Sequence, residues 1–213
     1  MLQVLIPISD NQIFFPKEEY FFPKPIIEVL NKPLIVQVIS YLEKSIKPDL
    51  FICVIPKSLW NLWSIEKIIA LSIKTPVKFF VREDNNSGSI CSCLLASDLI
   101  EEGEIICANM DEIMDINLDN IINDFKAKQS DSGLILYPAS HPRLGYAVVD
   151  NKNNVIECSQ RKVISKYAMA GFYYYKNKDI FITSCSEVLL SNDDYKGEFF
   201  ICSSINQIIL MGK

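Results

Sequence analysis

Glycine is scarce in this sequence, and none of the seven glycines occurs before residue 88. The first apolar run, residues 3–8, is therefore not followed by the glycine-rich loop that many nucleotide-binding folds place after their first strand. A Pro-Lys-Pro at residues 23–25 stands there instead, preceded by two phenylalanines. Proline fixes the backbone on both sides of Lys24, so this lysine is the first candidate for binding an anion at the strand end.

A surplus of basic residues is also missing. The chain has 21 Lys and Arg against 26 Asp and Glu, which gives a formal net charge of -5. Neutralising a polynucleotide backbone needs clustered positive charge, so nucleic-acid binding is not expected. A local basic pocket for a small anion remains compatible with this composition.

Histidine is nearly absent, because His141 is the only one. The seven cysteines are scattered, mostly in apolar runs, where a free thiol behaves as a small hydrophobic side chain. Their spacing does not match the common zinc sites, and their use fits a reducing compartment. We interpret His141, which precedes a proline, as a turn residue.

Long apolar runs and a basic leader are absent, so we expect no membrane span and a cytoplasmic protein. No Gly/Ser linker or internal repeat divides the 213 residues, of which 49% are hydrophobic and 11% aromatic. One domain, residues 1–213, is therefore expected.

The order of apolar segments favours an α/β fold. Strand-like runs occur at 3–8, 50–55, 77–81, 104–109, 133–138, 146–150, 154–158 and 170–176, and helical spacing at 33–46, 58–73, 88–100 and 118–128. Strands and helices alternate in the first half, 1–130, as in a parallel sheet. In the second half, 131–213, strands follow one another closely, which indicates antiparallel pairing and a hairpin around residues 150–154. Ligands of such sheets bind beyond the carboxyl ends of the strands, which directs attention to 9–24, 83–92, 109–115, 138–146 and 157–171.

Five segments, in this order, resemble the sugar-phosphate nucleotidyltransferases, the pyrophosphorylase-type enzymes. They are IPISDNQIFFPKEEYFFPKPIIEVLNKPLI (6–35), NNSGSICSCLLA (85–96), CANMDEIMDI (107–116), SQRKVISKYAMAGFYYYK (159–176) and GEFFICSSINQIILMGK (197–213). The resemblance is closest to the compact members encoded with bacterial capsule and lipopolysaccharide genes. It implies a Rossmann-like (GT-A-like) α/β fold with a mixed, mostly parallel central sheet flanked by helices. It also implies a nucleotide-binding half, 1–130, and a sugar-phosphate-binding half, 131–213.

The family's chemistry joins a nucleoside triphosphate to a sugar or polyol phosphate, with release of pyrophosphate and help from Mg²⁺. By resemblance, Lys24 meets the nucleotide phosphates and Asp111 binds the metal ion, completed by Asn206 where the family commonly has a carboxylate. Further nucleotide contacts are implied for Ser9, Asp10, Gly88, Ser89 and Ser92. In the phosphate loop, Asp10 and Gln12 replace expected glycines and Phe14 replaces an arginine.

On the sugar-phosphate side the family usually has a glutamate-lysine pair, and this chain has Gln160 and Arg161. Arginine keeps the charge and offers a planar fork suited to phosphate, so we assign it the catalytic role of gripping that group. Lys162 is its neighbour. The remaining contacts implied on this side are those of Arg143, Gly145, Tyr146 and Gly171.

Two alternatives remain open. The substitutions in the phosphate loop and at Gln160, Arg161 and Asn206 also fit a catalytically impaired relative that binds a nucleotide, a sugar phosphate or a biosynthetic partner. A small GT-A-like glycosyltransferase using Asp111 for its metal is a further alternative. Trp60 and Trp63 indicate core packing or an interface, such as that of a homodimer.

Overall fold

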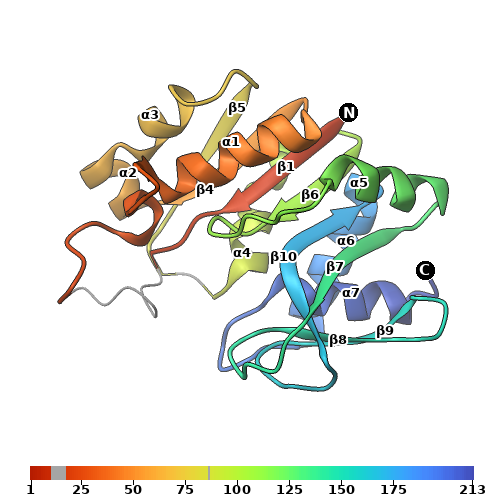
Figure 1. The fold of residues 1–213 in the computed structure, drawn as a ribbon. Helices are drawn as coiled ribbons and strands as arrows, with labels where there is room; N and C mark the ends of the chain where they lie inside the picture. The colour runs from red at the N-terminus through yellow and green to blue at the C-terminus, as the bar shows by residue number, and fades with distance from the viewer. Residues whose placement is uncertain (11–17, 86) are drawn as a thin grey trace.

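The computed structural model describes residues 1–10, 18–85 and 87–213. Their main feature is an eight-stranded mixed sheet (Figure 1). Its strand order is β5 (Val77–Arg82), β4 (Leu50–Pro56), β1 (Leu2–Pro7), β6 (Glu104–Ala108), β10 (Tyr167–Tyr175), β8 (Tyr146–Val149) and β9 (Val155–Ser159), and β7 (Ser132–Pro138) also pairs with β10. The expected mixed central sheet is confirmed.

The first half of the chain forms the parallel part of this sheet. Strand β1 pairs in parallel with β4 and β6, and β4 pairs in parallel with β5. Both faces of β1 are covered, because Val4 and Ile6 enter one hydrophobic cluster and Leu5 enters the other. Such double burial explains why these strands read as continuous apolar runs.

The second half adds antiparallel strands, as the sequence predicted. Strand β10 pairs antiparallel with β6, β7 and β8. The β8–β9 hairpin turns at Asp150, whose N–H donates to Asn154 O at 2.9 Å, and Asn153 has a φ of 64°. The predicted hairpin around residues 150–154 is therefore confirmed.

Helices cover both faces of the sheet (Figure 1). One face packs against α1 (Leu34–Ile46), α2 (Lys57–Trp63), α3 (Ile65–Ala70) and α5 (Leu118–Ala127), and the other against α4 (Ser89–Leu95), α6 (Lys178–Leu190) and α7 (Ile201–Leu210). Short 3₁₀ turns η1 (Lys24–Ile26) and η2 (Ser97–Leu99) and the small hairpin β2 (Glu28–Val29) and β3 (Lys32–Pro33) complete the fold.

Two predicted helices differ from the structure. The segment 58–73 was expected to be one helix, but Ser64 takes a left-handed φ of 47° and separates α2 from α3. The segment 88–100 ends its α-helix at Leu95 and continues as η2. Helices α6 and α7 were not predicted, because their β-branched and cysteine-rich sequences resemble buried strands.

Trp60 and Trp63 are partly buried against the first cluster. All seven cysteines are free thiols, and all except Cys91 are buried. In the part of the chain that the structure describes, no helix has the length and apolar character needed to cross a membrane.

Candidate functional site

A cleft of about 560 Å³ lies at the carboxyl ends of the parallel strands. Residues at or just after the ends of β1, β4, β5 and β6 line one side of the cleft. Residues of the second half of the chain, among them Arg143, Arg161 and Glu198, line the opposite side. Of the residues assigned to the site from sequence, it contains Ser9, Asp10, Lys24, Gly88, Ser89, Ser92, Asp111, Arg143 and Arg161. Ligand binding at this edge of an open α/β sheet is the general rule.

An ion pair between Lys24 and Asp111 lies in this cleft. The Lys24 ammonium donates a hydrogen bond to the Asp111 carboxylate, and the two side chains are 12% and 29% exposed. Lys24 begins η1, and Asp111 lies just beyond the buried strand β6. The cleft therefore holds a cation and a carboxylate side by side, both within reach of solvent.

Asp10 has a structural partner in the same region. Its carboxylate accepts a hydrogen bond from the Lys24 backbone N–H at 3.3 Å. This bond ties the end of β1 to the Pro-Lys-Pro turn, which explains an acidic residue where a glycine was expected. Gln12 and Phe14, also singled out from sequence, lie outside the described residues.

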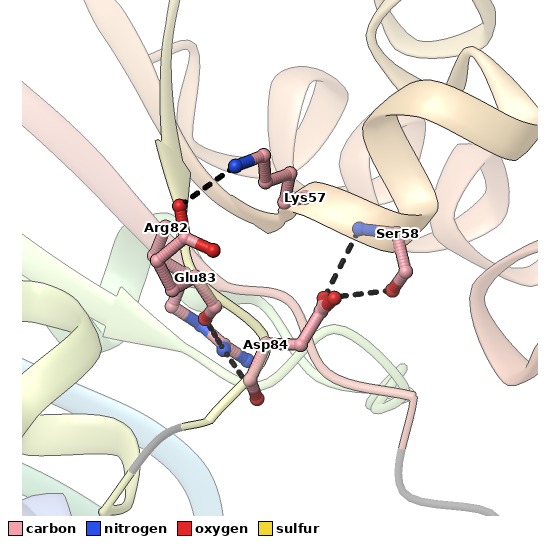
Figure 2. Close-up of polar contacts among 5 residues, drawn as sticks. All are labelled: Lys57, Ser58, Arg82, Glu83 and Asp84. Atoms are coloured by element: carbon pink, nitrogen blue, oxygen red, sulfur yellow. Dashed lines mark hydrogen bonds and ion pairs between the residues drawn. The ribbon is translucent and has the colours of Figure 1, made fainter.

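Polar side chains at the end of β5 and just beyond it contact the start of α2 (Figure 2). Three of them line the cleft, namely Ser58, Arg82 and Asp84. The Asp84 carboxylate accepts hydrogen bonds from the N–H and hydroxyl of Ser58, at 3.0 and 2.8 Å, and Lys57 pairs with Glu83 at 2.9 Å. Arg82 is 6% exposed and donates to the carbonyl oxygens of Glu83 and Asp84. Burial lowers the pKa of the Arg82 guanidinium.

Gly88 has a φ of +106° and packs against the backbone of Phe199. A Cβ there would lie 2.5 Å from Phe199 N. Hydrogen bonds hold this approach: the Phe199 N–H donates to Ser87 O at 2.7 Å, and the Ile201 N–H donates to Ser89 Oγ at 3.2 Å. The glycine thus allows the C-terminal segment to close one side of the cleft.

Glu112 is a carboxylate that sequence reasoning did not assign to the site. It accepts hydrogen bonds from the Gly171 N–H and from Asn109 Nδ2, the latter at 2.9 Å. Burial raises its pKa, and these two hydrogen bonds oppose the rise. A Cβ on Gly171 would lie 2.7 Å from Asn109 Cβ, so glycine is required for this packing.

Arg161, at the opposite wall, has a left-handed φ of 53°. Its guanidinium carbon lies 5.7 Å from the centre of the Tyr195 ring and 5.6 Å from that of Phe200. Both distances are typical of cation–π contacts. Gln160 lines the cleft beside it.

Several residues assigned from sequence lie outside the cleft lining. Tyr146 is fully buried and donates from its hydroxyl to His141 O at 2.8 Å, and Gly145 packs against Met169, which a Cβ would approach to 2.6 Å. Lys162 is exposed, and Gly171 lies beneath Asn109. Tyr146, Gly145 and Gly171 are therefore packing residues outside the cleft surface.

Asn206 is not among the residues that line the cleft with Asp111. Its Oδ1 accepts the Cys158 N–H at 2.7 Å and its Nδ2 donates to Cys158 O at 2.9 Å. Both ends of the amide therefore serve to fasten α7 to the edge strand β9. This position explains an amide where a metal ligand was expected, because a carboxylate has no N–H to donate to the carbonyl.

The cleft also contains residues that were not assigned from sequence, among them Ser58, Arg82, Asp84, Asn109, Glu112, Tyr173, Glu198 and Phe200. Arg82 and Asp84 could have been assigned to the site from the sequence, since both follow the predicted strand 77–81. Glu198 and Phe200 could not have been assigned in this way, because the helix α6 that precedes them in the chain was not predicted.

Comparison with known proteins agrees with this architecture. The family model described as "Nucleotidyl transferase" matches residues 20–208. The bifunctional protein GlmU of Methanococcus aeolicus is 26% identical over 210 residues, which cover 96% of this chain and 44% of GlmU, so the chain spans less than half the length of that relative.

Solved structures show the same fold. A nucleoside-diphosphate-sugar pyrophosphorylase from Vibrio cholerae RC9 superposes with a TM-score of 0.77 at 18% identity, covering 100% of this chain and 88% of that one. A UDP-glucose pyrophosphorylase complexed with UDP-glucose gives a TM-score of 0.74 at 15% identity, with coverage of 96% and 85%. The expected Rossmann-like nucleotidyltransferase fold is confirmed. The family model matches residues 20–208, which is most of the chain, and this match shows that the chain belongs to the nucleotidyl transferase family.

Proposed function

We propose that this protein joins a nucleoside triphosphate to a sugar or polyol phosphate and releases pyrophosphate. The observation that carries the proposal is the meeting of Lys24 and Asp111 in a cleft at the ends of β1 and β6, in a chain of this family. We further propose that the product is an activated sugar or polyol for a bacterial capsule or lipopolysaccharide, made in the cytoplasm.

In the proposed reaction, an oxygen of the sugar phosphate attacks the α-phosphorus of the nucleotide. The bond from that phosphorus to the bridging oxygen breaks, and pyrophosphate leaves. Lys24 binds phosphate oxygens of the nucleotide and stabilises charge there. Arg161, across the cleft, binds the sugar phosphate and holds it for attack, because two anions must be brought together against their repulsion.

A magnesium ion fits this arrangement through Asp111. The described residues contain no group of three or more His, Cys, Asp or Glu side chains able to hold a metal ion by themselves. Magnesium is commonly held by one or two carboxylates together with substrate phosphates, and Asp111 offers one such carboxylate in the cleft. When bound, the ion would neutralise part of the phosphate charge.

A second candidate is a binding protein without turnover. It is favoured by Asn206, whose amide bonds to Cys158 at both ends and which does not line the cleft with Asp111. Such a protein would bind a nucleotide or sugar phosphate in the same cleft.

The test begins with thermal shifts in Mg²⁺ with CTP, UTP, dTTP, GTP and ATP, because a ligand of the native state raises its apparent stability. Pyrophosphate release is then measured for the stabilising nucleotide against a panel of sugar and polyol phosphates, with Asp111→Asn as the control. Release that needs both substrates supports the enzyme. Stabilisation by a nucleotide without pyrophosphate release for any substrate pair supports the binding protein. If no nucleotide stabilises the protein and no pyrophosphate is released, both candidates are contradicted.

A further inference from the structure

A turn at residues 195–200, here called the aromatic turn, lies against Arg161. The Tyr195 and Phe200 rings lie at its two ends, and the guanidinium carbon of Arg161 is within 6 Å of both ring centres, at 5.7 and 5.6 Å. Glu198, which lies between them in the sequence, lines the cleft. The two rings of the aromatic turn therefore restrict the position of the Arg161 side chain.

The Arg161 guanidinium keeps its hydrogen-bond donors available. In the described ranges, 1–10, 18–85 and 87–213, no hydrogen bond or ion pair joins it to another residue. A guanidinium that contacts ring faces still has N–H groups directed outward in its own plane. Rings can thus restrict the side chain without competing for the anion that it would bind.

The aromatic turn is itself held firmly. Tyr195 and Glu198 exchange two backbone hydrogen bonds, at 2.9 and 3.2 Å. Lys196 and Gly197, between them, both have positive φ, 56° and 80°, as in the tight turns that join paired strands. Beyond the pair, the Phe199 N–H donates to Ser87 O, so the turn is anchored to the segment that opens α4.

From these contacts we propose that Tyr195 and Phe200 are positioning residues, which hold the Arg161 guanidinium ready to bind the phosphate of the second substrate. The proposal rests on the proposed function for the identity of that substrate. The physical benefit is pre-organisation: an arginine side chain that is already restricted loses less conformational freedom when it binds.

Tyr195→Leu is the main test, because Phe200 also packs against the core and its replacement would disturb folding. We expect the KM for the phosphorylated co-substrate to rise about 2- to 5-fold, the size of one cation–π contact, with the KM for the nucleotide unchanged. Tyr195→Phe keeps the ring and should restore the wild-type KM. Tyr167→Leu, which removes a ring that contacts Lys166 at 5.1 Å outside the cleft, is the matched control.

A double-mutant cycle decides whether Tyr195 acts through Arg161. In an Arg161→Ala background, Tyr195→Leu should have no further effect on KM. An equal rise in both backgrounds, or a parallel rise in the KM of the nucleotide, would overturn the proposal.

A measurement without turnover separates this proposal from the proposed function. Phenylglyoxal modifies arginine, and peptide mass spectrometry reports how well inorganic phosphate protects Arg161. Protection should require several-fold more phosphate in Tyr195→Leu than in the wild type, whether or not any substrate pair reacts. Equal protection in the two proteins overturns the positioning role, whereas absence of turnover with the difference in protection intact overturns only the proposed function.

Discussion

The ammonium of Lys24 and the carboxylate of Asp111 are paired at the edge of the sheet although they are 87 positions apart in the chain. Each is placed by a different device. Pro23 and Pro25 fix the backbone around Lys24, and the buried strand β6 carries the chain to Asp111. Without ligand the two charges neutralise each other, so a nucleotide phosphate that binds Lys24 must compete with this carboxylate.

Lys24→Ala and Asp111→Asn should each lower kcat/KM by about 100-fold or more, the usual effect of removing a group that stabilises transition-state charge. The pair is partly exposed, so the free energy of unfolding should change by only about 1 kcal/mol. Steady-state kinetics and denaturant titration provide the two measurements. Lys78→Ala is the control, because it breaks the exposed Lys78–Glu101 pair outside the cleft. Wild-type rates in both cleft variants would contradict the site assignment.

Gly88→Ala should destabilise the protein far more than Gly197→Ala. Both glycines have positive φ, but a Cβ at Gly88 would collide with the backbone of Phe199, whereas Gly197 has open space around it. We expect about 1–2 kcal/mol for the backbone strain at Gly197 and more than about 3 kcal/mol at Gly88. Chemical denaturation of the two variants measures the difference. Equal losses would show that Phe199 can move aside.

The strand ends of the parallel half could be predicted because buried strands leave continuous apolar runs. Lys24, Gly88 and Asp111 were assigned in this way and by resemblance, and they lie in one cleft. The break at Ser64 could not be predicted, since its left-handed backbone falls on a serine rather than on the glycine or asparagine that favour this conformation.

The opposite wall was harder to predict because it depends on long-range packing. The contact of Phe199 with Gly88 joins segments more than a hundred residues apart and leaves no local pattern. Asn206 illustrates the same limit: its position in the family order suggested a metal ligand, while its contacts fasten α7 to β9. Resemblance gave the order of these segments but not the partner of each side chain.

Asn206→Ala should lower the free energy of unfolding by about 1–3 kcal/mol, because it leaves the N–H and carbonyl of Cys158 without their partners. The Mg²⁺ concentration that gives half-maximal rate should stay unchanged. Denaturant titration and a magnesium titration of the rate test the two parts. Gln207→Ala, the next residue on α7, loses only an exposed hydrogen bond to Ser191 and serves as the control. A weakened magnesium dependence in Asn206→Ala would restore the role as a metal ligand.

The stability of Glu112→Gln relative to the wild type should increase as the pH rises, from a starting value lowered because the glutamine NH₂ cannot accept one of the two hydrogen bonds from Gly171 and Asn109. Burial raises the pKa of Glu112 above its ordinary value of 4.5; the neighbouring Asp111 adds to the rise, and Lys24 opposes it. Between the ordinary and the raised pKa the folded state binds more protons than the unfolded state, so wild-type stability falls as pH rises through that interval and stays lower above it. Glutamine has no such proton to lose.

The free energy of unfolding of wild type and Glu112→Gln is therefore measured by denaturant titration from about pH 4 to pH 8. The difference between them should grow in favour of the variant and then become constant above the raised pKa. Glu102→Gln, which removes an exposed carboxylate, is measured in parallel. If the difference for Glu112→Gln does not change with pH, the hydrogen bonds from Gly171 and Asn109 cancel the effect of burial on the pKa; if it moves against the variant as the pH rises, they outweigh that effect.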